Sequence, residues 1–330
     1  MFDYRVILIT GVEGKVGQGI LHRVIEEYNR CKIIVTCENV IVANELFNQY
    51  YQPKKGKNII FKAIEIDLNC IQSVLNFINC VKEETQTIDL LFFNAGKINC
   101  NGINNWKLIY QLSTNFNGLF VYPEYINFIT KLNKNNINQC FMINILSHYI
   151  IFLKLMSLFN KNQVKIIWTG SNQANKYHFN INDIQANSSI NPYASNKFAI
   201  QLLNNYINEK YIKNNIHSYV FHPGIVPSNL LATLFPSFIL IYIIPIFMFI
   251  LKLLFHLDHF TLYSSNATAP LSFIFKNNNL LENTRLDAST DNWNNNIIEL
   301  VNIGHKEEEG NKLQELFMYK LNQLVEKMLE

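Results

Sequence analysis

The sequence has few charged residues and little excess of either sign. Charged side chains make up 16% of the 330 residues, against about 25% in a typical soluble chain. This low charge excludes a disordered acidic or basic tail protein, and a mean hydropathy of +0.03 excludes a polytopic transporter. A formal net charge of +3 gives no broad basic surface, so we expect no nucleic-acid partner.

Paired cysteines and metal-ligand clusters are also lacking. The six cysteines form no C-x-x-C pair, which argues against a zinc ribbon or a thioredoxin-like site. We expect their thiols to be buried and reduced, which fits a chain that faces the cytosol. His256 and His259 have the spacing of one helical face but no evident third ligand, so we predict no metal site. The apolar run Val6–Thr10 is too short for a signal peptide, and we expect none.

Strand-like and helix-like segments alternate along the chain as far as His222. Short apolar, β-branched runs predict buried strands, and apolar residues at helical spacing predict the helices between them. Such alternation predicts an α/β fold, a doubly wound parallel sheet of the Rossmann type with helices on both faces. The predicted strands are Val6–Thr10, Lys32–Thr36, Ile59–Ile66, Asp89–Phe93, Val164–Thr169 and Ile216–His222, and the predicted helices are Gln18–Tyr28, Ser73–Val81, Gln139–Leu155 and Tyr193–Asn208.

A glycine-rich turn joins the first strand to the first helix. Glycines let backbone N–H groups approach a pyrophosphate at a helix N-terminus, where the helix dipole favours negative charge. Asp67 follows the third strand, where it can accept from an adenine amino group or simply cap the next helix. The predicted cofactor-binding residues of this half are Thr10, Gly11, Gly14, Lys15, Val16, Gly17, Asp67, Asn94, Ala95 and Gly96.

Tyr193 and Lys197 are spaced i, i+4 on a predicted helix and therefore share a face. A phenol has a pKa of about 10, and a nearby ammonium favours its ionised form, which makes it a usable proton donor and acceptor. The pair alone is common on protein surfaces. A serine that follows the fifth strand, Ser171, and an asparagine on the preceding helix, Asn144, make the pattern more specific.

The order of these elements resembles the short-chain dehydrogenase/reductase family, and within it the sterol 3-keto reductases. The closest stretches are Lys165–Ser171 and Pro192–Lys197, separated by a wider gap than is usual in the family, followed by Pro223, Gly224 and an apolar run. The resemblance implies hydride transfer from a reduced nicotinamide to a sterol ketone, with 17-beta-hydroxysteroid dehydrogenase activity as a possible addition. It also leaves a homo-oligomer open.

The resemblance further implies a role for each site residue. Tyr193 would protonate the developing alkoxide, and Ser171 would hydrogen-bond the same oxygen. Lys197 would hold the nicotinamide ribose and lower the pKa of Tyr193, and Asn144 would anchor a water that relays the proton. Pro223, Gly224 and Ser228 would complete the cofactor site, with Ser228 at the carboxamide.

The chain departs from the family around the adenosine end. Lys15 stands where the second glycine of the turn is usual, and Glu13 adds a negative charge beside it. Glu38 follows the second strand, where NADP-preferring relatives carry Arg and where a carboxylate would repel a 2′-phosphate. The resemblance implies NADP(H), and Glu38 keeps NAD(H) open. Two alternative functions remain: reduction of another lipophilic carbonyl, and a non-catalytic nucleotide-binding scaffold.

An apolar segment follows the catalytic half. Leu230–Leu251 contains no charged residue, although Pro236 and Pro245 argue against one straight helix. In the fold implied by the resemblance, Ser265–Phe275 returns to the sheet, so we predict a membrane-embedded hairpin or interfacial insertion, with a buried substrate lid as the alternative. We expect a catalytic core over residues 1–229, this segment over 230–260, and C-terminal helices over 261–330. The expected location is the endoplasmic reticulum membrane, with the core facing the cytosol.

Overall fold

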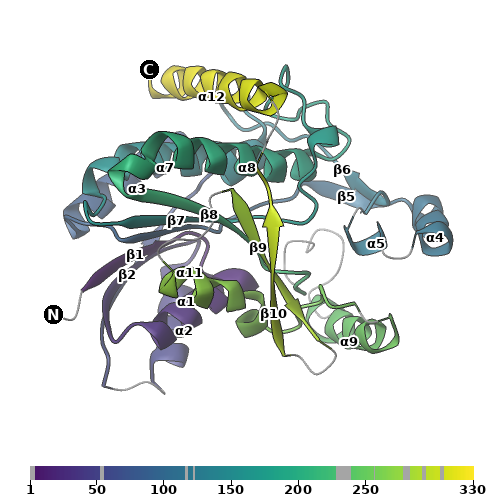
Figure 1. Cartoon of the computed structure of the whole chain (residues 1–330), viewed down its shortest axis with the longest axis horizontal. Helices are drawn as coiled ribbons and strands as arrows, with labels where there is room; N and C mark the ends of the chain where they lie inside the picture. The colour runs from purple at the N-terminus through teal and green to yellow at the C-terminus, as the bar shows by residue number, and fades with distance from the viewer. Residues whose placement is uncertain are drawn as a thin grey trace.

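The computed structural model describes residues 4–52, 56–115, 118–121, 123–227, 239–255, 257–277, 283–291, 295–304 and 308–330. At its centre lies an eight-stranded sheet in the order β10-β9-β8-β7-β4-β1-β2-β3 (Figure 1). Neighbouring strands are parallel except for the antiparallel pair β9 and β10. The strands are β1 (Arg5–Ile9), β2 (Arg30–Cys37), β3 (Asn58–Glu65), β4 (Leu90–Phe93), β7 (Val164–Thr169), β8 (Ile216–His222), β9 (Thr284–Thr290) and β10 (Asn296–Asn302).

All six predicted strands are present within a residue or two of the expected bounds, and the predicted doubly wound fold is confirmed. The strand order turns back between β1 and β4, which is the switch point where open α/β sheets bind ligands. Strands β9 and β10 were not predicted, because polar residues interrupt both segments. In β9 these include Arg285 and Asp287, which are buried because they pair with each other.

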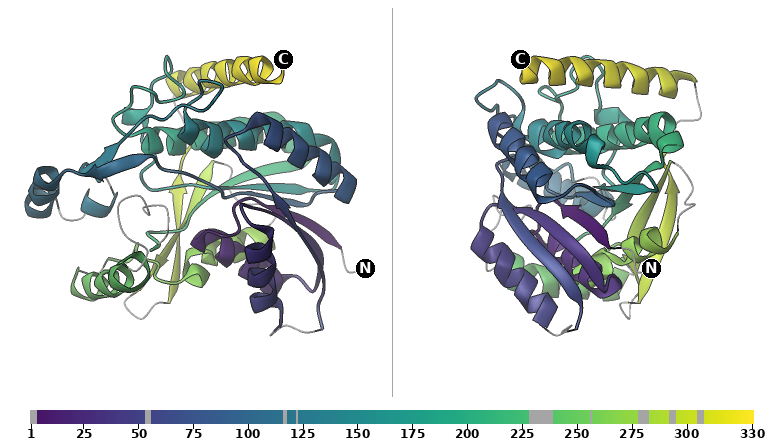
Figure 2. Two further views of the ribbon diagram at one scale, coloured as in Figure 1. Left: turned by 180° about the vertical axis from the view of Figure 1, so that it is seen from behind. Right: turned by 90° about the vertical axis from the view of Figure 1, so that its left-hand side faces the viewer.

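Helices cover both faces of the sheet (Figures 1 and 2). Two separate apolar clusters, one on each face, fix them in place. The first face carries α1 (Lys15–Glu27), α2 (Val40–Tyr51) and α11 (Ala269–Lys276); the second carries α3 (Ile71–Glu84), α7 (Ser147–Leu155) and α8 (Pro192–Tyr211). The predicted C-terminal amphipathic helix is α12 (Glu308–Leu329), which packs outside α8 through Phe317 and Leu321.

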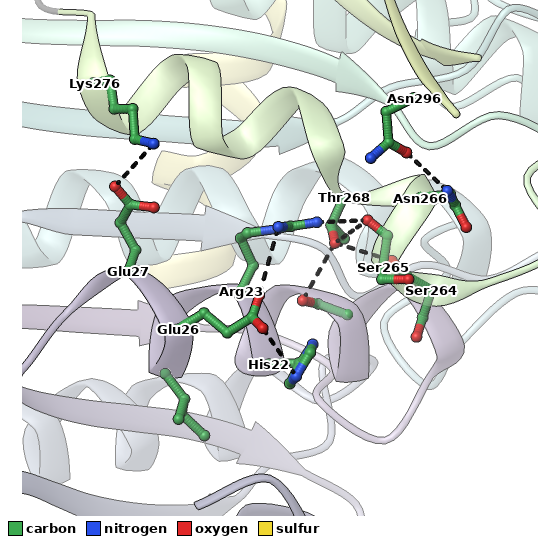
Figure 3. A network of polar contacts seen from close by, with 12 residues as sticks. His22, Arg23, Glu26, Glu27, Ser264, Ser265, Asn266, Thr268, Lys276 and Asn296 are labelled. Atoms are coloured by element: carbon green, nitrogen blue, oxygen red, sulfur yellow. Dashed lines mark hydrogen bonds and ion pairs between the residues drawn. The ribbon is translucent and has the colours of Figure 1, made fainter. Parts of the chain in front are cut away.

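The predicted return of the chain to the sheet is confirmed in α10 (Ser264–Ala267) and α11, which pack on α1 (Figure 3). Gly19 permits the close approach, since a Cβ there would lie 2.5 Å from the Ser264 carbonyl oxygen. Arg23 donates to the Ser265 carbonyl at 2.7 Å, and Thr268 Oγ1 donates to the Gly19 carbonyl at 3.3 Å. The segment after the apolar run is therefore part of the same core as the first helix.

Gln139–Leu158 is the segment of the described chain that is long and apolar enough to cross a membrane, and 67% of it is buried inside the protein. It comprises α6 (Gln139–Phe141), a π-helical turn η2 (Met142–Leu146), α7, and the 3-10 turn η3 (Met156–Leu158). Its side chains belong to the apolar cluster between the sheet and α3. The helix predicted at Gln139–Leu155 is therefore present, and it is a core helix.

The two ends of the apolar segment are held together beside the end of β8. Ile225 and Phe260 form a parallel bridge, with Ile225 N–H donating to the His259 carbonyl at 2.8 Å and Thr261 N–H to that of Ile225 at 3.3 Å. Between them, residues 239–255 form a π-helical turn η7 (Ile239–Ile243) and α9 (Ile244–Phe255). The predicted segment Leu230–Leu251 thus lies partly outside the described residues, but its chain leaves and returns at one place.

A small lobe stands apart from the sheet. It consists of a two-stranded hairpin, β5 (Cys100–Ile103) and β6 (Ile126–Phe128), with α4 (Asn105–Thr114) and α5 (Gly118–Val121) between its strands. This lobe and α9 lie at the same end of the molecule, both in Figure 1 and in the view from behind in Figure 2.

Candidate active site

The glycine turn after β1 has no room for side chains at two positions. Gly11 has a φ of 68°, and a Cβ there would lie 2.8 Å from Cα of Ala95. A Cβ on Gly17 would lie 2.1 Å from the Gly11 carbonyl oxygen, whereas the nearest atom to one on Gly14 would be 3.9 Å away. Gly11 and Gly17 therefore allow the tight turn and close backbone approach that a dinucleotide needs.

This turn presents the N-terminus of α1 at the edge of the sheet. Gly14 is the N-cap without a side-chain cap, and the first helical hydrogen bond runs from Gln18 N–H to the Gly14 carbonyl at 2.8 Å. The N–H groups of Lys15, Val16 and Gly17 precede that bond and have no intrahelical acceptor. Oriented donors at the positive end of a helix dipole fit the pyrophosphate of a dinucleotide.

Thr10 ties the glycine turn to the end of β4. Its hydroxyl donates to the Phe92 carbonyl at 3.1 Å and accepts from the N–H groups of Asn94 at 2.9 Å and Ala95 at 3.1 Å. The Asn94 amide donates back to the carbonyls of Thr10 and Gly11 at 3.1 and 2.9 Å. Thr10 and Asn94 thus build the frame of the site and bring Ala95 and Gly96 to its edge.

Tyr193, Ser171 and Lys197 come together at the same edge. Asn191 caps α8 by accepting from Ala194 N–H at 3.0 Å, which places Tyr193 in the first turn of the helix. The Ser171 hydroxyl accepts from Gln173 N–H at 3.1 Å and is near enough to the Tyr193 phenol to lower its pKa. The Lys197 ammonium lies 5.4 Å from the centroid of the Tyr193 ring and donates to the Thr169 carbonyl at 2.6 Å.

Burial dominates the protonation of these groups. It raises the pKa of Tyr193 to about 12, against a smaller lowering by the Ser171 hydrogen bond. It also lowers the pKa of Lys197 to about 8. Lys197, which the resemblance led us to expect would lower the Tyr193 pKa, is not among the causes of this shift, and loss of hydration outweighs the one lowering contribution, that of Ser171. At neutral pH, Tyr193 carries its proton and Lys197 is largely charged.

Asn144 lies on the π-helical turn η2, and its side chain is committed to the backbone. Its Oδ1 accepts from Lys97 N–H at 2.7 Å, and its Nδ2 donates to the Lys97 carbonyl at 3.0 Å. The role of Asn144 in holding a proton-relay water stays a prediction. The amide itself fixes the chain just after Gly96.

His148 is a buried residue of the site that the sequence did not reveal. Its Nε2 lies 3.1 Å from Thr10 Oγ1, and its Nδ1 lies 3.4 Å from the Asn144 carbonyl oxygen. Burial lowers the pKa of His148 to about 3, so the ring is neutral at neutral pH. It connects the glycine turn to the helix that carries Asn144. A histidine on a predicted apolar helix gave no signal that distinguishes this from a core position.

Arg285 and Asp287 stand behind Ser171 and were also missed. The Arg285 guanidinium contacts both Asp287 carboxylate oxygens, at 2.5 and 2.6 Å, and donates to the Ser171 carbonyl at 3.0 Å. Alternate residues of a strand share one face, so Arg-x-Asp in β9 is compatible with this pair, but the sequence does not show that it reaches Ser171. The buried pair holds the backbone that carries the Ser171 hydroxyl.

The remaining predicted cofactor residues lie in different parts of the structure. Asp67 is exposed at the sheet edge and does not cap the next helix, because the N-cap of α3 is Cys70. One Asp67 carboxylate oxygen accepts from Asn69 N–H at 2.8 Å in the loop before that helix. The Pro223 carbonyl accepts from Thr261 Oγ1 at 2.6 Å, and Gly224 has a φ of 73°. Both of these residues thus lie beside the paired ends of the apolar segment at Ile225 and Phe260, which we call its neck. Ser228 lies outside the described residues.

Comparison with known proteins agrees with this geometry. The short chain dehydrogenase family model matches residues 5–237. The 3-keto-steroid reductase/17-beta-hydroxysteroid dehydrogenase 7 of Rattus norvegicus is 27% identical over 82% of this chain and 81% of its own. The 3-keto-steroid reductase ERG27 of Saccharomyces cerevisiae is 25% identical over 68% of each chain.

A solved structure shows the same fold. The 3-ketoacyl-(acyl-carrier-protein) reductase from Brucella melitensis, complexed with NADH, superposes with a TM-score of 0.55. It covers 87% of this chain and 97% of its own, at 14% sequence identity. At this identity the likeness concerns the fold alone.

Proposed function

The chain belongs to the short-chain dehydrogenase family of NAD(P)-dependent oxidoreductases, and on that premise we propose that it reduces the ketone of a sterol to an alcohol. The observation that carries the proposal is the grouping of Tyr193, Ser171 and Lys197 at the sheet edge that also bears the glycine turn. The sterol class is supported by the mammalian and yeast relatives named as 3-keto-steroid reductases.

In this proposal, Tyr193 is the general acid. A bound nicotinamide supplies the hydride. Tyr193 gives its proton to the oxygen that becomes the alcohol, and Ser171 donates a hydrogen bond to the same oxygen as negative charge develops there. Lys197 uses one donor on Thr169, and its remaining N–H groups would hold the nicotinamide ribose.

Two other functions compete with this one: reduction of a different lipophilic carbonyl by the same residues, and a non-catalytic nucleotide-binding scaffold. 17-beta-hydroxysteroid dehydrogenase activity would not compete with sterol reduction but would be a second reaction at the same site. A non-catalytic scaffold is disfavoured, because Ser171, Tyr193 and Lys197 are kept together and Ser171 is braced by Arg285.

A turnover assay separates these functions. Purified protein with a 4-methyl sterol 3-ketone is expected to oxidise NADH or NADPH, with one alcohol formed per nucleotide consumed, as followed by absorbance and product analysis. A retinal and a fatty acyl ketone serve as comparison substrates. Turnover of either of these without the sterol would contradict the sterol proposal, and nucleotide binding without turnover of any carbonyl would favour the scaffold.

We further propose that the apolar segment attaches the protein to a lipid bilayer, the endoplasmic reticulum membrane, with the catalytic core in the cytosol. A lid would bury α9 against the core, but Ile246 and Leu254 of this helix are 62% and 66% exposed. Lys252, its one charged residue, is buried and donates to the Phe260 carbonyl at 3.2 Å. The outer face of α9 is therefore uncharged and apolar, as in interfacial helices.

The neck of the segment supports insertion rather than a single span. Since Ile225 and Phe260 are bridged, the chain enters and leaves from one side. At the same end of the molecule, α4 exposes Trp106 and Tyr110, and these aromatic types favour the membrane interface.

Charged substitutions on α9 are expected to release the protein from lipid. The double variant Ile246→Asp/Leu254→Asp should no longer float with phosphatidylcholine vesicles in a density gradient, whereas the wild-type protein should float even in high salt. Tyr177→Asp is the matched control, since Tyr177 is an exposed aromatic residue outside α9. Wild-type protein that high salt removes without detergent would favour the lid.

A further inference from the structure

The Glu13 carboxylate occupies a pair of backbone donors just after β2. One of its oxygens accepts from Glu38 N–H at 2.6 Å, and the other accepts from Asn39 N–H at 3.1 Å. Two adjacent N–H groups that converge on one carboxylate form an anion-binding site. In this chain, the anion that fills it comes from the glycine turn itself.

This contact lies beside the cofactor cradle. The end of β2 is hydrogen-bonded to the glycine turn, with Gly11 N–H donating to Thr36 Oγ1 at 3.0 Å and Val12 N–H to the Thr36 carbonyl at 3.2 Å. In this type of fold, the residue after the second strand meets the adenosine ribose, whose 2′ position carries a hydroxyl in NADH and a phosphate in NADPH. Glu13 therefore lies where the two nucleotides differ.

The charge around this point is negative. Glu13 and Glu38 both stand at the end of β2, and Glu65 is paired with Cys37 at the end of β3. The pKa of Cys37 is raised to about 11, by burial first and then by the negative charges of Glu13 and Glu65. Lys15 is the one cation of the glycine turn, and it is exposed.

We infer that this chain selects NADH over NADPH and that Glu13 is a specificity-determining residue. A 2′-phosphate would have to displace the Glu13 carboxylate from the two N–H groups and then remain beside Glu38. A 2′-hydroxyl can instead donate to a carboxylate at the same place. The inference rests on the nicotinamide cofactor of the proposed function, and it departs from the NADP(H) preference that the family resemblance implies.

Equilibrium binding of NADH and NADPH to the purified full-length chain, by isothermal titration calorimetry without any ketone, tests the inference. We expect the wild-type protein to bind NADH at least about tenfold more tightly than NADPH, because like charges repel at the ribose. Glu13→Gln keeps the shape but removes the charge. It should tighten NADPH binding by roughly tenfold and change NADH binding by less than about threefold. Glu45→Gln, an exposed residue of α2, should change neither affinity.

Several results would overturn the inference: tighter binding of NADPH by the wild-type protein, an unchanged affinity ratio in Glu13→Gln, or no binding of either nucleotide. The first two results are distinct from failure of the proposed sterol reaction, whereas no binding of either nucleotide would contradict the proposed cofactor as well. A protein that prefers NADH but reduces no sterol ketone would keep this inference and lose the sterol substrate. A protein that reduces the sterol with NADPH alone would do the reverse.

Discussion

Replacing Tyr193 by Phe is expected to lower kcat for ketone reduction by roughly 10³-fold, within the range for loss of a general acid. The reason is the state of the phenol, which keeps its proton at neutral pH because burial raises its pKa to about 12. Ser171 and Lys197 lie beside it. The measurement is single-turnover reduction at saturating nucleotide, together with the nucleotide Kd, which should change little because the ring remains in place.

A second tyrosine of the same helix provides the control. Tyr206 hydrogen-bonds to Lys210 at 2.7 Å, away from Ser171, so Tyr206→Phe should leave kcat within about twofold of wild type.

The pH profile adds an independent readout. Since the pKa of Lys197 is lowered to about 8, its charge is lost above that pH, and we expect the wild-type rate to fall there. Near wild-type turnover by Tyr193→Phe would refute the assignment of the acid.

Replacing Gly17 by Ala is expected to destabilise the protein by about 3 kcal/mol or more, at the upper end of the cost of overpacking. The added Cβ would lie 2.1 Å from the Gly11 carbonyl oxygen and 2.9 Å from Cα of Val12, and backbone cannot move aside as a side chain can. The forced shift would open the turn and weaken nucleotide binding by roughly 100-fold, because the pyrophosphate needs close backbone approach. Urea unfolding and calorimetric titration measure the two effects.

Gly14 makes the comparison sharp. It lies in the same turn, but its φ is −69° and an added Cβ would meet no atom closer than 3.9 Å. Gly14→Ala should therefore cost no more than about 1 kcal/mol, the price of a poorer N-cap. Equal losses of stability in the two variants would show that the tight contact at Gly17 does not control the turn.

Most of the sheet could be predicted from the sequence because its central strands are short and buried on both faces. Runs such as Arg5–Ile9 and Leu90–Phe93 consist mostly of apolar residues that are buried in the structure, and this pattern is typical of parallel sheets. The same holds for the ends of these strands. Thr10 and Asn94 follow buried strands directly and Ser171 follows one after Gly170, so parallel topology alone predicts that they share one edge.

What could not be predicted are contacts between segments that are distant in sequence. Arg285 and Asp287 look like surface residues until their mutual pairing allows both to be buried beneath Ser171. The Glu13 carboxylate reaches the backbone of Glu38 across two loops, and no spacing rule encodes that contact. Exposed apolar residues of α9 have the same composition as buried ones, so the sequence alone leaves lid and membrane insertion unresolved.

The bridge between Ile225 and Phe260 has a consequence for how such enzymes diversify. The two segments that meet at this bridge are also joined to Pro223 through Thr261, so the residues between them are anchored to the sheet at one place. The segment between Ile225 and Phe260 is thus an insertion whose two ends are fixed at the same point of the fold. We expect that its length and hydrophobicity can change during evolution or in protein engineering, while the register of β8 and β9 stays the same.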